Sequence, residues 1–194
     1  QHLQLVSGLA PMYAGMLLVP GTVATMIAGL TIARVAVHFH PAQIVAFGLA
    51  LNATAFAALA ILGAHQDVVI ILIFIVLGTG IGISQTISND LMLSSVPPRK
   101  AGAASAISET SYEMGAVLGT VIMGGILTSV YRANLVIPEG VNAELADNAH
   151  ETLGGAVKVA SELGGEQAGQ LLTSAFASFD SGVVYSSAFS AVLM

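Results

Sequence analysis

The sequence has 194 residues, of which 55% are apolar and only 8% are charged, and its mean hydropathy is +0.86. A soluble domain carries about a quarter charged residues, so this composition excludes an ordinary soluble protein and indicates a membrane protein. The net charge of -6 argues against nucleic-acid binding, which relies on Lys and Arg, and the absence of cysteine excludes disulfides and thiolate metal sites.

Four apolar segments are each long enough to cross a membrane as a helix. A hydrocarbon core of about 30 Å needs about 20 helical residues, and backbone in lipid must satisfy its own hydrogen bonds, which excludes isolated strands. The predicted spans are 11–34, 41–64, 68–93 and 101–131. We therefore predict an all-α membrane protein in which residues 1–131 form transmembrane helices.

A polar and acidic block, residues 132–178, follows the fourth span. Apolar residues recur at helical spacing from 142 to 163 and again from 171 to 179, with Gly164-Gly165 between them. We predict an external hairpin of two helices that covers the outer mouth of the bundle, and the alternative is a disordered acidic linker. Residues 179–194 are predicted to begin a further transmembrane helix.

The basic residues in the connectors predict how the chain is oriented. Arg34, Arg99 and Lys100 fall in the first and third connectors, which lie on the same side of the membrane if the spans alternate. Because cytoplasmic connectors carry an excess of Lys and Arg, that side is predicted to be cytoplasmic. The turn at 63–67 and the acidic block are then predicted to lie outside.

Two carboxylates interrupt the fourth span. Glu109 and Glu113 lie one helical turn apart, although a charged side chain at the middle of a bilayer costs about 2.5–3.5 kcal/mol. Such residues face a helix bundle or a water-filled cavity, where they bind cations or relay protons. A proton and an organic cation would compete for these carboxylates, which is the physical basis of proton/cation antiport. The alternative is that the acids, Glu109 above all, reach the cytoplasmic interface.

Polar side chains near the two acids complete the predicted site. Ser105 and Tyr112 share the helical face of Glu109, and Tyr112 can donate a hydrogen bond or offer its ring to a cation. Gln85 and Asn89 share a face of the third span and are predicted to line the same cavity. We therefore predict that protons and small lipophilic cations bind at Glu109, Glu113, Tyr112, Gln85 and Asn89.

The remaining polar and glycine signals predict packing or interfaces. Glycines 78 and 82, like glycines 115 and 119, have the spacing that lets helices approach closely. Asp90 is predicted to lie at the cytoplasmic interface as a cap. No nucleophile-base pair, phosphate-binding loop, cofactor motif or metal-ligand motif is visible in the sequence, so we predict neither an enzyme nor a bound cofactor or metal.

The segment 94–119, with the run Glu-Thr-Ser-Tyr-Glu-Met-Gly at 109–115, resembles the drug:proton antiporter branch of the major facilitator superfamily. These are fourteen-span, QacA- and SmvA-like exporters of quaternary ammonium antiseptics and dyes. The runs 4–20 and 131–180 are similar to that branch as well, so the resemblance covers essentially the whole chain. One departure is Thr25, which stands where some of these exporters carry an acid.

The resemblance implies a C-terminal fragment of a proton-coupled multidrug efflux transporter, with the acidic positions of the family falling on Glu109 and Glu113. It implies a helix bundle that exports lipophilic or quaternary ammonium cations by alternating access across a bacterial inner membrane. The expected partners are the lipid bilayer, protons, the cationic substrates and the N-terminal half of the same transporter. Two alternatives remain open: an exporter of a neutral or anionic metabolite whose glutamates serve only protons, and a non-transporting membrane scaffold or sensor.

Overall fold

In the computed structural model, which describes residues 2–63 and 66–194, the chain forms helices and no strand. The four longest apolar helices are α1 (Pro11–Val35), α2 (Pro41–Leu62), α3 (Asp67–Ser94) and α4 (Ala101–Asn134). Each of them, alone or with a short 3-10 helix beside it, is long and apolar enough to cross a membrane. Their bounds lie within a few residues of the predicted spans, and the middle of the predicted turn at 63–67 lies outside the described residues.

Prolines and a glycine explain where these helices begin and end. Pro11 and Pro41 stand at the first position of α1 and α2, where a fixed φ favours the helix and a missing N–H costs nothing. Gly63 ends α2 with a φ of +66°, which a residue with a side chain rarely adopts. Pro97 and Pro98 separate α3 from α4, and only the short 3-10 helix η3 (Pro98–Lys100) lies between them.

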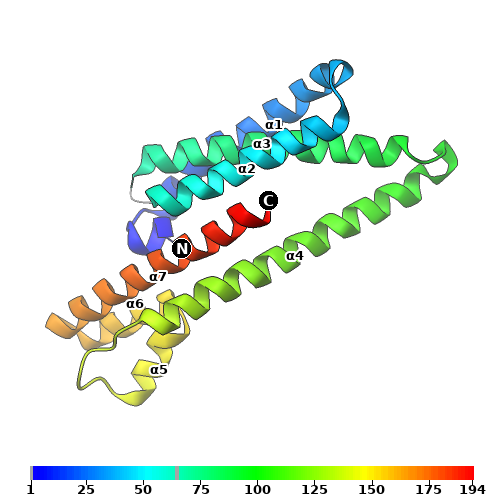
Figure 1. The fold of residues 1–194 in the computed structure, drawn as a ribbon. Helices are drawn as coiled ribbons and strands as arrows, with labels where there is room; N and C mark the ends of the chain where they lie inside the picture. Colours follow the sequence, from blue (N-terminus) through cyan, green and yellow to red (C-terminus); the bar gives the residue numbers. More distant parts are fainter. Residues whose placement is uncertain (1, 64–65) are drawn as a thin grey trace.

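The helices α1, α2 and α3 form one layer, in which α3 packs along both of the others (Figure 1). A Cβ atom added at Gly78 would collide with the carbonyl oxygen of Gly21 on α1, so the predicted close approach at this glycine is confirmed. Gly80 points the other way, and a Cβ there would lie 2.6 Å from the carbonyl oxygen of Gly48 on α2. The glycine run of α3 therefore serves two helix interfaces at once.

The helix α4 diverges from α3 after their connection, and α7 (Gly165–Leu193) packs along α4 and against α2 (Figure 1). A Cβ added at Gly182 of α7 would lie 2.9 Å from the carbonyl oxygen of Leu127 on α4, so this glycine permits the close contact. Gly115 and Gly119 of α4 have no atom of another described element within 4 Å of such a Cβ. The close packing predicted at these two glycines is therefore not made within the described chain.

The acidic block is folded, so the alternative of a disordered linker is wrong. It contains α5 (Ala143–Glu151), which packs on α6 (Leu153–Leu163), and α6 in turn packs against α7. We call α5, α6 and residues 165–179 the cap. Its side chains form a well-buried core together with the end of α4 and the residue after it: Tyr131, Leu135, Ala149, Leu153, Ala156, Val159, Ala160, Leu171, Ala175 and Phe179.

The cap differs from the predicted two-helix hairpin in two ways. The predicted helix 142–163 is broken at Thr152, whose backbone is extended and whose hydroxyl accepts a hydrogen bond from the Gly155 N–H at 3.0 Å. A threonine that caps α6 has non-helical backbone angles, so α5 cannot continue through it. The second predicted helix and the predicted start of a further span at 179 are one continuous helix, α7, because no residue between Gly165 and Leu193 breaks it.

Candidate functional site

A cavity of about 590 Å³ lies between α1, α3 and α4, at the end of the bundle where α3 connects to α4. Each helix contributes residues spaced three and four apart, which places them on one face. Its lining consists of Thr25, Met26, Gly29 and Leu30 from α1, Gly82, Gln85, Thr86 and Asn89 from α3, and Ser105, Ser108, Glu109 and Tyr112 from α4.

The structure brings four of the five predicted site residues together in this cavity. Gln85 and Asn89 lie on the α3 wall, and Glu109 and Tyr112 lie on the α4 wall. The two walls are linked where the buried Ser108 hydroxyl donates a long hydrogen bond of 3.5 Å to Asn89 Oδ1. Glu109 is exposed and Tyr112 is half-buried, so a ligand in the cavity can reach both side chains.

Glu113 does not belong to the lining of this cavity. Its side chain is exposed on α4, one turn farther from the α3–α4 connection than Glu109. The reason is geometric: α4 diverges from α3, so each further turn of α4 lies farther from the opposite wall (Figure 1). The structure thus separates two acids that their spacing had placed in one site.

The α1 wall is the part of the site that the sequence prediction missed. Met26 and Leu30 give it two flexible apolar side chains one turn apart. The Thr25 hydroxyl donates a hydrogen bond of 3.0 Å to the Gly21 carbonyl of its own helix, and its oxygen can still accept one from a ligand. From the sequence, Thr25 is notable only because some similar exporters carry an acid at that position. No signal in α1 alone shows that this face meets Glu109.

The cavity has the chemistry of a site for a small organic cation. Glu109 is the one carboxylate among its lining residues, and Tyr112 adds a ring whose face attracts cations. The apolar α1 wall and a few polar groups on α3 follow the usual pattern of ligand sites, which are mostly apolar with a few placed polar groups. Within residues 2–63 and 66–194 no group of three His, Asp or Glu side chains could hold a metal ion.

Comparison with known proteins places the chain in a family. Residues 1–120 match the model of the Major Facilitator Superfamily. The chain belongs to the major facilitator superfamily. It is 46% identical over 195 residues to the multidrug efflux pump LfrA of Mycolicibacterium smegmatis, an alignment that covers all of this chain and 39% of LfrA. The family resemblance predicted from the run at 109–115 is therefore confirmed.

Two further relatives of this major facilitator chain have names that refer to resistance. It is 31% identical over 180 residues to the methyl viologen resistance protein SmvA of Salmonella typhimurium, which covers 90% of this chain and 36% of SmvA. It is 30% identical over 193 residues to the tetracenomycin C resistance and export protein of Streptomyces glaucescens. That alignment covers 94% of this chain and 35% of the relative. The chain thus spans well under half the length of each of these relatives. It is a multi-pass membrane protein of a transporter family, and its apolar helices contact lipid.

Proposed function

We propose that this chain forms part of a multidrug exporter that couples outward transport of lipophilic cations to inward movement of protons across a bacterial inner membrane. The names of the relatives support export of drug-like compounds, and all three relatives are bacterial. Because the chain spans less than half the length of these relatives, the remaining helices, including the N-terminal half, would complete the transport path.

The observation that carries the proposal is the position of Glu109 in a cavity with both aromatic and flexible apolar walls. A lipophilic cation places its charge at the carboxylate and the ring of Tyr112 and its apolar body against Met26 and Leu30. A proton on the same carboxylate removes the attraction, so cation and proton compete for one group. This competition couples the two movements if the cavity opens to one side of the membrane at a time.

The other predicted residues have supporting roles in this proposal. The side-chain amides of Gln85 and Asn89 offer donors and acceptors to water or to polar groups of a substrate. Glu113 lies one turn deeper on α4 and outside the cavity, so we assign it to the proton path rather than to the apolar body of the substrate. A carboxylate at this depth in a span must face protein or water, because lipid would not solvate its charge.

The experiment is transport of ethidium by the full-length protein in proteoliposomes, driven by an imposed pH gradient. We expect Glu109→Gln to lower the initial rate by about ten- to a hundredfold, as is usual when a charge-assisted contact is lost. Glu113→Gln is expected to uncouple transport from the pH gradient. The matched control is Glu144→Gln on α5, the same change in the cap, which is expected to leave the rate unchanged.

Unchanged pH-driven transport in Glu109→Gln, in Glu113→Gln and in the double variant would refute the mechanism. The same assay tests the substrate class, because other organic cations should compete with ethidium. If the protein transports a neutral or anionic compound and organic cations do not compete, the glutamates serve protons alone. If neutralising both acids changes nothing while deleting 140–175 abolishes function, the chain is a scaffold or sensor.

A further inference from the structure

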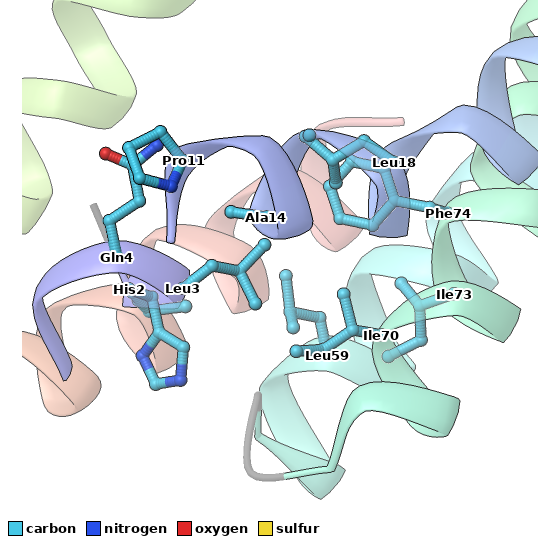
Figure 2. Close-up of a pocket in the computed structure, with 12 residues that line it drawn as sticks. His2, Leu3, Gln4, Pro11, Ala14, Leu18, Leu59, Ile70, Ile73 and Phe74 are labelled. Carbon is cyan, nitrogen blue, oxygen red and sulfur yellow. The ribbon is translucent and has the colours of Figure 1, made fainter. Parts of the chain in front are cut away.

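A second cavity, of about 360 Å³, lies at the other end of the bundle, where the π-helix η1 (His2–Val6) meets α1, α2, α3 and α7. Figure 2 shows its two chemically different sides. Leu59, Ile70 and Phe74 make an apolar side, and the polar side chains of His2 and Gln4 lie on the opposite side.

A carboxylate outside the lining contacts the polar side of this cavity through His2. His2 Nδ1 lies 2.9 Å from Asp180 Oδ1 of α7, and the two side chains are only 13% and 29% exposed. Asp180 precedes Val183, which lines the cavity, by about one helical turn. A cationic group inside the cavity near His2 is therefore close to a partly buried negative charge.

The volume of the cavity indicates the size of a ligand. The cavity is partly open and offers a space of about 360 Å³. An apolar cavity of roughly 150 Å³ binds benzene in another protein. The cavity at η1 is about twice that size and suits an apolar body of two fused or linked aromatic rings.

We propose that this cavity is a second binding site for a lipophilic cation, whose aromatic body fills the apolar side and whose positive end replaces His2 beside Asp180. Its use on an export path, at the end of the bundle predicted to face outward, rests on the proposed function. The binding itself does not, because it depends only on the cavity and on Asp180.

The test uses two probes of the same shape, naphthylmethyltrimethylammonium and its neutral carbon isostere, which carries a neopentyl group. Binding to the full-length protein in nanodiscs is measured by calorimetry in the Glu109→Gln background, so that the cavity at Glu109 lacks its charge. We expect the cation to bind at least about tenfold more tightly than the isostere, because only the cation is attracted by the negative charge of Asp180. Equal affinities would overturn the assignment to cations.

Two variants locate the binding at this cavity. Gly15→Leu is expected to weaken both probes at least about tenfold by filling the space. A Cβ at Gly15 meets no atom of another helix within 4 Å, and leucine favours a helix over glycine, so this variant should fold. Asp180→Asn is expected to weaken the cation about tenfold and to leave the isostere unchanged, because only the cation is attracted by the carboxylate charge.

The control is Gly102→Leu, the same substitution in open space at the start of α4, which should change neither affinity. Unchanged binding in Gly15→Leu, or equal loss of both probes in Asp180→Asn, would overturn the proposal. If export depends on Glu109 but these variants do not alter binding, only the proposal of a second site is refuted. If export is absent altogether but the variants behave as expected, the proposed function fails and the second site stands.

Discussion

Tyr131 joins the end of α4 to the cap, and replacing it with phenylalanine should loosen α5 and α6 specifically. The side chain is 2% exposed, and its hydroxyl donates a hydrogen bond of 2.9 Å to the Ala149 carbonyl near the end of α5. Carbonyls at the end of a helix have no partner within the helix, so Tyr131→Phe leaves this one buried and unpaired. An unpaired buried acceptor costs about 1–3 kcal/mol.

Hydrogen exchange measured by mass spectrometry reports this cost directly. A loss of about 1–3 kcal/mol corresponds to exchange that is roughly 5 to 150 times faster, here for the amides of α5 and α6 if the cap opens as a unit. Exchange in α1 and α3 should stay unchanged. The matched control is Tyr185→Phe, because Tyr185 is 61% exposed and makes no hydrogen bond of this kind. Unchanged exchange in the cap, or equally fast exchange throughout the chain, would refute the role given to Tyr131.

Three further predictions follow from the packing and from the cavity at Glu109. Gly80→Val should destabilise the protein by about 1–3 kcal/mol in detergent unfolding, because its side chain would meet the Gly48 carbonyl, whereas Gly119→Val in open space should cost less; equal losses would contradict the interface. Thr152→Ala should lower the free energy of unfolding by about 1 kcal/mol and speed hydrogen exchange at the start of α6. Unchanged exchange there would show that the hydroxyl does not cap that helix. Met26→Ala should raise the half-saturating concentration of large lipophilic cations in the transport assay and leave small ones unaffected, and an equal change for both would argue against an apolar wall.

The spans and four of the residues that line the candidate cavity could be predicted from the sequence, because both depend on neighbours along one helix. The length of an apolar run predicts a span, and residues three or four apart share a face, which is how Gln85 and Asn89 were paired. Contacts between helices could not be predicted in this way. The roles of Met26 and Gly80 depend on which helices flank α3, and neither residue carries a local signal of its neighbours.

Two sequence predictions differ from the structure because a pattern seen along one helix was applied beyond the residues that it describes. The helical spacing of apolar residues continues through Thr152, so the pattern did not reveal that this residue stops one helix and caps the next. The shared face of Glu109 and Glu113 was taken to meet one cavity, which assumes that α3 and α4 run side by side. They diverge instead, and only Glu109 remains opposite α3.

Because α7 is one unbroken helix, the direction in which it faces the cap fixes the direction in which it faces the bundle. Phe179 belongs to the core of the cap, and Gly182, three residues later, lies against Leu127 of α4. An α-helix turns about 100° per residue, so inserting one alanine after Phe179 would rotate one contact away from the other. Insertions of one and of four residues at that point should therefore differ sharply, because four residues nearly complete a turn. Along α7 the chain therefore tolerates a change in length only in whole turns.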